Sequence, residues 1–390
     1  MQLQLPQPSP DALAASCALQ EKIASEIESS GGWISFARYM ELALYAPGLG
    51  YYSGGSAKLG KDGDFTTAPE MTPLFGRTLA HAAAALFAQC PRNLVEFGAG
   101  TGKLARDMLT ELEQIGAPAA SYAIVELSGE LRERQQQTLR DFPQVRWLDT
   151  MPERFSGVAI GNEVLDAMPV RLLVRQASGW LERGVARIST STSAGTNFGF
   201  GFSDRACPPE ELAQLLAQVP EPDALPDGYV AEVHPLARGF MHSLCGILDQ
   251  GAAIFVDYGF PAHEYYLPQR VAGTLMCHYR HHAHDDPFYL PGLQDITAHV
   301  DFTDVARAGL DSGADLLLYT SQASFLLNAG LPALLMQTPA DDHLRYLPLA
   351  NAVQKLTSPA EMGELFKVLV MGRKIALPPA LAPGDRSHRL

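Results

Sequence analysis

A glycine-rich turn between an apolar segment and a helix-forming segment restricts this chain to a small group of folds. Residues 93–114 read NLVEFGAGTGKLARDMLTELEQ, with glycines at positions 98, 100 and 102. Glycine lets the backbone turn sharply and lets a ligand approach it closely, as between the first strand and first helix of open α/β sheets. We therefore expect residues 93–97 to form a strand and residues 103–115 to form a helix.

The same alternation of strands and helices continues along the chain. It predicts an α/β fold with a mostly parallel sheet that is covered by helices on both faces. Further strands are expected at residues 121–127, 145–148, 157–162 and 251–259, with helices near 129–140 and 234–249. Other expected elements are helices at 10–30, 34–45 and 72–89, a hairpin at 171–188, and a helix that begins after Ser358.

The expected organisation has four parts. Residues 1–92 form an N-terminal helical segment and a loop, and residues 93–260 form a Rossmann-like core that carries the 171–188 hairpin as an insertion. Residues 261–310 are rich in His, Asp and Pro and break the alternation, so we expect them to be an insertion that covers the substrate side of the site. Residues 311–390 then complete the core with strands and helices. The glycine-rich loop at 46–70 is long enough to suggest a functional role.

The acids around the glycine turn indicate which ligand it binds. Glu126 ends the next expected strand, where a carboxylate can accept hydrogen bonds from both hydroxyls of a ribose. The dinucleotide fingerprint G-x-G-x-x-G requires glycine where this chain has Lys103. Glu96 precedes the first glycine, and its charge suits an ammonium and a sulfonium better than a pyrophosphate. The sequence therefore favours S-adenosylmethionine over NAD. The residues expected to bind it here are Glu96, Gly98, Gly100, Gly102 and Glu126.

Two further groups of polar residues follow later strands. Asp149 comes after the strand at 145–148, where it can either meet the amino group of an adenine or cap a helix. Asn162, Glu163 and Asp166 lie at the end of the strand at 157–162. Ligands of open α/β sheets bind at the carboxyl ends of the strands, so these three residues are the candidate catalytic residues. Their loop lacks the Asn/Asp-Pro-Pro-aromatic sequence expected of enzymes that methylate nucleobase amino groups.

Several longer motifs carry a family resemblance. They are YAPGLGYYSGG and GDFTTAPEMTPLFG, EFGAGTGKLARDML, GNEVLDAMPV, VDYGF, HHAHDDPFYLPGLQDITAHVDF and TSPAEMGELFKVLV, and they run from about residue 31 to 371. In this order they resemble the MidA family of NDUFAF7-like protein arginine methyltransferases. The resemblance implies a class I S-adenosylmethionine-dependent methyltransferase with a Rossmann-like, seven-stranded sheet.

The resemblance also implies a reaction and a partner. The family's mitochondrial member symmetrically dimethylates an arginine on the 49-kDa-type subunit of respiratory complex I and assists complex I assembly. GNEVLDAMP is similar to the Asn-Glu loop of type II arginine methyltransferases, in which the glutamate holds the guanidinium. A second glutamate of that hairpin has no counterpart at a matching position. The alternatives are a small-metabolite methyltransferase, or an assembly chaperone that binds S-adenosylmethionine without turnover.

Composition narrows the remaining choices. The formal net charge of −14 disfavours binding to nucleic acid or to anionic lipid, and no apolar run is long enough for a membrane span. The N-terminus has neither a basic signal region nor an Arg-rich transit peptide, so we expect a bacterial cytoplasmic protein. The five scattered cysteines are expected to be reduced thiols. A homodimer is compatible with the sequence.

The histidine-rich segment at 277–284, CHYRHHAH, resembles a metal site only superficially. Its spacing matches no zinc finger or ribbon, and no cysteine pair accompanies it. Methyl transfer to nitrogen also needs no metal. We therefore expect no metal cofactor and assign these residues to the 261–310 insertion.

Overall fold

The computed structural model describes residues 5–54, 67–192 and 195–390. The chain divides into two compact units, each built from stretches that are separated in the sequence. Unit 1 combines residues 1–65, 167–237 and 262–299, and unit 2 combines residues 66–166, 238–261 and 300–390. Of the loop predicted at 46–70, residues 55–66 lie outside the described residues, and its end begins the short helix α3 (Ala68–Met71).

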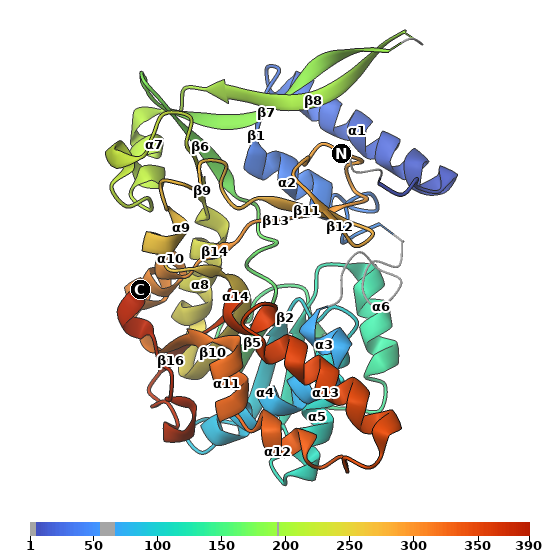
Figure 1. Ribbon diagram of the computed structural model, residues 1–390, viewed down its shortest axis with the longest axis vertical. Coiled ribbons are helices and arrows are strands. Elements are labelled where there is room, and N and C mark those ends of the chain that lie inside the picture. The colour runs from blue at the N-terminus through green and yellow to red at the C-terminus, as the bar shows by residue number, and fades with distance from the viewer. Residues whose placement is uncertain (1–4, 55–66, 193–194) are drawn as a thin grey trace. The chain divides into compact units, whose positions relative to one another are not determined.

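Unit 2 is built on one large sheet, of which β2, β5, β10, β14 and β16 are labelled in Figure 1. Its strands lie in the order β15-β16-β10-β5-β2-β3-β4, and the two-residue strand β14 (Val300–Asp301) also pairs with β10. The strands β10, β5, β2, β3 and β4 run parallel to one another, and β16 runs antiparallel to both of its neighbours. The predicted α/β fold with a mostly parallel sheet is confirmed. The bounds are β2 (Asn93–Phe97), β3 (Ser121–Val125), β4 (Val145–Leu148), β5 (Phe155–Asn162), β10 (Leu248–Phe260), β15 (Asp315–Ser321) and β16 (Phe366–Arg373).

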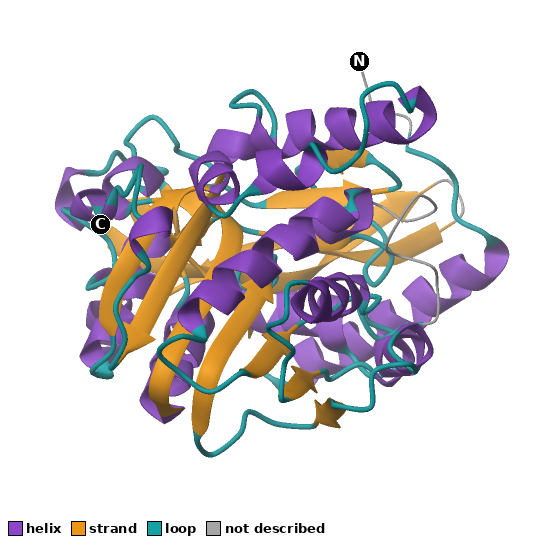
Figure 2. Cartoon of the chain, turned by 90° about the horizontal axis from the view of Figure 1, so that it is seen from below, coloured by secondary structure: helices purple, strands orange, loops and turns teal. Residues whose placement is uncertain are grey.

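Helices pack on both faces of this sheet, as the orange strands and flanking purple helices of Figure 2 show. On one face, Leu94, Ile160 and Ile254 join a buried core with α4 (Pro73–Leu86) and α5 (Lys103–Gln114). On the other face, the ring of Phe240 in α8 (Pro235–Ile247) lies 5.0 Å from that of Phe97 and 5.8 Å from that of Phe255. Successive residues of a strand point to opposite faces, so the uninterrupted apolar strands feed both cores.

The remaining helices of unit 2 surround this core. Asp301 ends β14 and caps α10 (Phe302–Asp311), accepting hydrogen bonds from the N–H groups of Thr303 and Asp304 at 3.0 and 3.3 Å. The other helices are α6 (Gly129–Thr138), α11 (Gln322–Asn328), α12 (Leu331–Leu335), α13 (His343–Thr357) and α14 (Met362–Leu365).

The helix predicted after Ser358 is wrong for most of its length. The helix α14 covers only four residues, and the chain then enters β16, which lies inside the sheet between β10 and β15. A short apolar run that is buried on both faces shows no helical period and no strand period, so its pattern does not separate the two structures. The β-branched Val368 and Val370 favour the strand.

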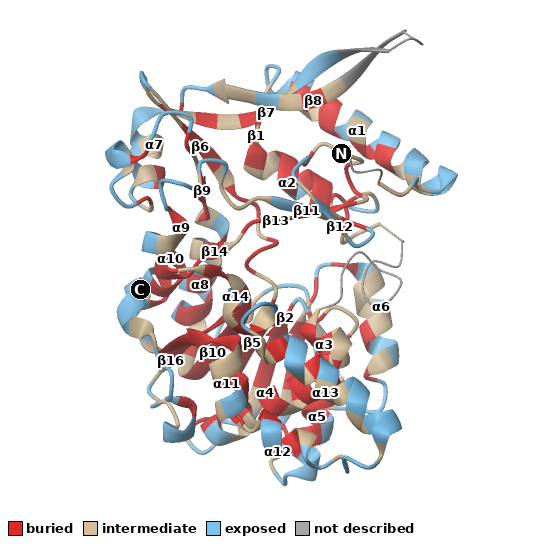
Figure 3. Cartoon of the chain, in the orientation of Figure 1, coloured by how far each residue is buried: buried red, intermediate tan, exposed pale blue. Residues whose placement is uncertain are grey.

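Unit 1 combines two small sheets with helices, and the buried residues (red) of these elements appear in Figure 3. One sheet has the order β1-β7-β6-β9, with β8 paired to β7. The predicted hairpin at 171–188 is confirmed by the antiparallel pairing of β6 and β7. The second sheet has the order β12-β11-β13 and lies within residues 261–310, the insertion that the sequence predicts. The helices and strands of unit 1 are α1 (Pro10–Ser29), β1 (Ile34–Ser35), α2 (Phe36–Tyr45), β6 (Arg171–Gln176), β7 (Gly179–Thr192), β8 (Gly195–Arg205), α7 (Pro209–Leu216), β9 (Val230–Val233), α9 (Ala262–Tyr265), β11 (Met276–Tyr279), β12 (His282–His284) and β13 (Asp295–Thr297).

The core of unit 1 explains why α1 and α2 form where the sequence predicts them. Leu19 and Ile23 of α1 and Phe36 of α2 are fully buried in one apolar cluster. Ser35 precedes α2 and accepts a hydrogen bond from the N–H of Arg38 at 3.2 Å, which caps the helix. Among the described helices of the chain, none is long and apolar enough to cross a bilayer.

Candidate active site

The glycine turn lies between β2 and α5, as the sequence predicts. Gly98, Gly100 and Gly102 have φ angles of +64°, +52° and +81°, a backbone region that residues with side chains rarely adopt. A Cβ atom on Gly98 would lie 3.1 Å from Cγ2 of Val164. The turn therefore needs glycine for its conformation, and at Gly98 it also needs the space.

Glu126 directly follows the neighbouring strand β3 and is held in place from two sides. Its Oε1 accepts a hydrogen bond from the N–H of Ser128 at 2.8 Å, and its Oε2 accepts one from Nε2 of Gln135 at 2.9 Å. Gln135 also donates to the carbonyl of Gly100 at 2.9 Å, so it ties the acid to the glycine turn. Burial raises the pKa of Glu126. A carboxylate has about four acceptor positions, which leaves room for the two hydroxyls of a ribose.

Glu96 lies within β2 beneath the turn and is only 1% exposed. Its Oε2 accepts a hydrogen bond from the hydroxyl of Tyr122 at 2.7 Å. Burial raises the pKa of Glu96 to about 7, and the nearby charge of Glu126 adds to that rise. Glu96 is therefore a buried acid, and its ionised form places a negative charge below the glycine turn.

Asp149 follows β4 but differs from the other predicted acids in being exposed. Its side chain is 86% exposed and pairs with Nη2 of Arg132 at 2.7 Å. The same nitrogen donates to the carbonyls of Glu126 and Leu148. The helix cap considered for Asp149 is not found, because the chain runs through a bend and a loop into β5.

The loop after β5 brings together the three predicted catalytic residues. Asn162 donates from Nδ2 to Oε1 of Glu163 at 3.1 Å. Glu163 has a φ angle of +52°, which is rare for a residue with a side chain and marks a constrained turn. Asp166 is 5% exposed at the other end of the turn. The structure thus has a strained, acidic turn at the carboxyl edge of the sheet, where the sequence predicted a polar, acidic loop.

Asp257 belongs to the same site, although the sequence reasoning gave it no role. It lies near the end of β10, is 1% exposed, and accepts hydrogen bonds at Oδ2 from the N–H groups of Val164, Leu165 and Asp166 at 3.1, 2.9 and 3.3 Å. Burial and the nearby carboxylates of Asp166 and Glu163 raise its pKa well above the usual range. The sequence does contain a signal for Asp257, since it is the acid of VDYGF, near the carboxyl end of the next parallel strand, where ligands of such sheets bind.

Glu70 is a second residue that the sequence reasoning missed. It lies on the short helix α3, and its Oε1 accepts a hydrogen bond from the hydroxyl of Thr101 at 2.5 Å. Its carbonyl accepts one from Nζ of Lys103 at 2.8 Å. Lys103, which replaces the third glycine of the dinucleotide fingerprint, is therefore engaged by protein groups at the start of α5.

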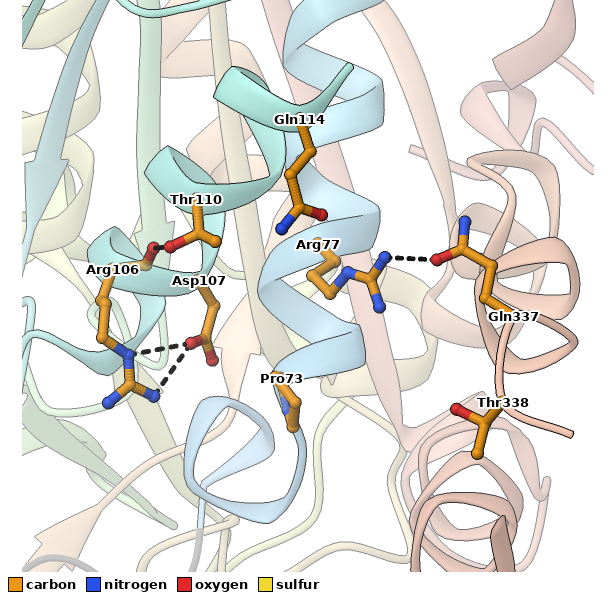
Figure 4. Close-up of a pocket in the computed structure, with 8 residues that line it drawn as sticks. All are labelled: Pro73, Arg77, Arg106, Asp107, Thr110, Gln114, Gln337 and Thr338. Atoms are coloured by element: carbon orange, nitrogen blue, oxygen red, sulfur yellow. Dashed lines mark hydrogen bonds and ion pairs between the residues drawn. The ribbon is translucent and has the colours of Figure 1, made fainter. Parts of the chain in front are cut away.

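A hollow elsewhere in unit 2 is separate from these residues (Figure 4). Nη2 of Arg77 donates to Oε1 of Gln337 at 2.6 Å, and Arg106 donates to Oδ1 of Asp107 at 2.9 and 3.1 Å. Both guanidinium groups thus already have acceptors, and the hollow offers no bare positive charge. It is lined by Pro73, Arg77, Arg106, Asp107, Thr110, Gln114, Gln337 and Thr338.

The histidine-rich segment forms the hairpin of β11 and β12 in unit 1. Tyr279 pairs with His282, and the two residues between them, Arg280 and His281, have φ angles of +46° and +64°. Two consecutive positive φ angles are those of a tight type I′ turn. Within the described ranges, no group of three or more His, Cys, Asp and Glu side chains is arranged to hold a metal ion.

The site in unit 2 fits a ribose-containing ligand with positive charge. The glycine turn is tied by Gln135 to the fixed carboxylate of Glu126, and the acids at the carboxyl edge of the sheet would favour a cation there. A sequence profile of the family described as "putative S-adenosyl-L-methionine-dependent methyltransferase" matches residues 75–320. The chain belongs to this family. It is a methyltransferase, and its cofactor is S-adenosylmethionine.

Solved structures and curated relatives agree with this assignment. A Burkholderia thailandensis protein crystallised with S-adenosyl-homocysteine is 56% identical, with a TM-score of 0.92, over 99% of the methyltransferase and 100% of that chain. A second structure from the same organism is 54% identical, with a TM-score of 0.89, over 99% and 100% of the two chains. The mouse protein named protein arginine methyltransferase NDUFAF7, mitochondrial, is 28% identical over 92% of the methyltransferase and 83% of its own length.

Proposed function

We propose that this methyltransferase transfers methyl groups to an arginine of a protein partner. The observation that carries the proposal is the acidic turn after β5, where Glu163 is held at a φ angle of +52° beside Asn162 and close to the buried Asp166 and Asp257. Several carboxyl groups at the edge of the sheet form an environment that attracts a cationic substrate. The mouse relative, named as a protein arginine methyltransferase, supports the same substrate class.

The chemistry explains why arginine needs carboxylates. A guanidinium has a pKa of about 12.5–13.8, so at neutral pH its positive charge is delocalised and no nitrogen has a free lone pair. A carboxylate paired with two of its N–H groups fixes the plane and draws positive charge toward those nitrogens. The remaining nitrogen can then act as the nucleophile.

The cofactor supplies an electrophilic methyl group on a sulfonium. As the nitrogen–carbon bond forms, the carbon–sulfur bond breaks, S-adenosyl-homocysteine is released, and the attacking nitrogen loses one proton to water. In this proposal Glu163 is the principal carboxylate that holds the guanidinium, Asp166 is the second, and Asn162 orients Glu163 through its 3.1 Å hydrogen bond. Positioning of this kind can lower a barrier by several kcal/mol, and by about 7–11 kcal/mol at its limit.

The proposed partner is the 49-kDa-type subunit of respiratory complex I or its bacterial counterpart, and the proposed product is symmetric dimethylarginine. Both follow from the resemblance of the ordered motifs between about residues 31 and 371 to the MidA family. The same resemblance proposes a role in complex I assembly.

The decisive experiment measures product formation with a defined partner. The purified chain is incubated with S-adenosylmethionine and the 49-kDa-type subunit, S-adenosyl-homocysteine is quantified, and mass spectrometry locates the modified residue. Symmetric dimethylarginine would support the proposal. Methyl groups on lysine or on a carboxylate would overturn the arginine mechanism, and turnover with small metabolites alone would favour a metabolite methyltransferase. Cofactor binding without turnover would instead favour an assembly chaperone.

A further inference from the structure

The side chain of Asp257 binds the backbone of the acidic turn, which consists of residues 162–166. One oxygen, Oδ2, accepts hydrogen bonds from three successive N–H groups, those of Val164, Leu165 and Asp166. The other oxygen, Oδ1, accepts one from the N–H of Tyr258 at 3.0 Å. Both oxygens of this buried side chain are therefore occupied by backbone donors, which fixes its position.

The strands beside Asp257 bring the rest of the turn into register. In the parallel pair of β5 and β10, Asn162 lies opposite Val256, and the N–H of Glu163 donates to the carbonyl of Val256 at 2.9 Å. The next three N–H groups of the chain then turn to the carboxylate of Asp257. Four consecutive N–H groups, from residues 163 to 166, are thus bound by two neighbouring residues of β10. This binding accounts for the survival of the unfavourable φ angle at Glu163, because strained backbone persists only where its surroundings over-determine it.

The charges around Asp257 add a second effect. The carboxylates of Asp166 and Glu163 face it from the turn, and both oppose its ionisation. From β16, Lys367 lies opposite Asp257 in the register, and its ammonium donates to the carbonyls of Glu364 and Leu365. Three carboxyl groups therefore lie near one another at the edge of the sheet, and any cation that binds there stabilises their charged forms.

We propose that Asp257 is a positioning residue for methyl transfer, which sets the geometry of Glu163 by holding the backbone of the acidic turn. The inference rests on the proposed role of Glu163 in holding the substrate. Asp257 itself is 1% exposed, and it acts through the backbone of residues 163–166 rather than by contact with substrate.

The test uses Asp257→Asn in the full chain, with Asp301→Asn as a matched control. Asp301 is also 1% exposed, ends the strand next to β10, and caps backbone N–H groups, but those groups belong to α10. The first readout is hydrogen exchange of the amides of residues 164–166. We expect exchange at least about tenfold faster in Asp257→Asn, because the amide side chain cannot accept from all four donors. We expect no change at these amides in Asp301→Asn.

The second readout is catalysis with the protein partner across a range of pH. In Asp257→Asn, kcat should fall by about tenfold or more, while the affinity for S-adenosyl-homocysteine stays within about twofold. The acidic limb of the pH–rate profile should also move to lower pH, because one of three mutually repelling carboxylates is gone. A merely structural role would lower activity without moving the pH profile.

Each outcome separates this inference from the proposed function. Unchanged exchange at residues 164–166, or equal effects of both variants on the pH profile, would overturn the role of Asp257. If Asp257→Asn does not fold, hydrogen exchange in the wild-type protein still tests the inference. Amides of residues 164–166 that exchange as fast as those of an unprotected loop would contradict their hydrogen bonds to Asp257. If wild-type protein methylates no arginine but Asp257→Asn still accelerates exchange, the proposed function fails and the hold on the turn stands.

Discussion

Replacing Glu126 by alanine should lower both the stability of the folded protein and its affinity for the cofactor. In the structure, the carboxylate of Glu126 satisfies the N–H of Ser128 and the side-chain amide of Gln135, and Glu126 is 8% exposed. A buried donor left without an acceptor costs about 1–3 kcal/mol, so the free energy of unfolding should fall by at least that amount. In the predicted binding mode, the ribose hydroxyls of the cofactor also lose Glu126 as their acceptor. Affinity for S-adenosyl-homocysteine should therefore fall by a further 1–3 kcal/mol, or about 5- to 150-fold.

Two measurements on one preparation separate these effects. Denaturant unfolding gives the change in stability, and isothermal titration with S-adenosyl-homocysteine gives the change in affinity. The control is Glu130→Ala on α6, the helix that carries Gln135, where a partly exposed pair with Arg134 is lost. That pair is worth about 0.3–0.5 kcal/mol, so the control should barely change either quantity. An affinity within about twofold of wild type in folded Glu126→Ala protein would mean that the ribose binds elsewhere.

Three other changes test separate parts of the site. Gly100→Val should abolish cofactor binding in titration calorimetry while the protein remains folded, because a β-branched residue is strained at a φ angle of +52° and crowds the ligand's approach. Glu163→Gln should leave cofactor affinity intact but lower turnover by about 10²-fold or more; if Asp166→Asn loses more activity, Asp166 is the principal guanidinium carboxylate. Because the folded-state pKa of Glu96 is about 7, its protonated form stabilises the fold at low pH, and this contribution is lost as the pH rises from 4.5 to 7. In Glu96→Gln, the free energy of unfolding should therefore fall by about 3 kcal/mol less than in wild type between these two pH values. Identical unfolding curves for wild type and Glu96→Gln at both pH values would refute that reading.

The sequence was sufficient to predict those strands and turns of the sheet whose pattern lies within a few neighbouring residues. The turn at Gly98, Gly100 and Gly102 and the strand end at Glu126 were predictable because strand, glycine and helix follow one another within a few residues. The strand β16 was not predictable in this way, because its apolar run of residues is buried on both faces and its neighbours in the sheet come from distant parts of the chain.

The same limit applies to the site. Glu163 and Asp166 were predictable as polar residues at a strand end, but their dependence on Asp257 is a contact between residues 91 or more positions apart. The burial of Glu96 and the exposure of Asp149 also depend on how neighbouring strands and helices pack. Sequence patterns place a side chain on an element, whereas its solvation is decided by the elements that cover it.

The position of β16 in the sheet has a consequence for synthesis of the chain. β16 is the last strand to leave the ribosome, yet it fills the gap between β10 and β15, which are both made earlier. Until residues 366–373 emerge, the two earlier strands each present an edge of unpaired N–H and C=O groups. The half of the sheet that carries the glycine turn can assemble beforehand, since β2, β3, β4, β5 and β10 pair without β16.

A stalled or shortened chain would therefore keep its glycine turn and acidic turn while exposing strand edges to other proteins. Such edges are templates for aggregation, and long-range strand pairing forms slowly. Cells that make this methyltransferase would be expected to shield the nascent sheet with chaperones. Removal of the segment after residue 365 should then yield protein that is lost to aggregation rather than a smaller cofactor-binding fragment.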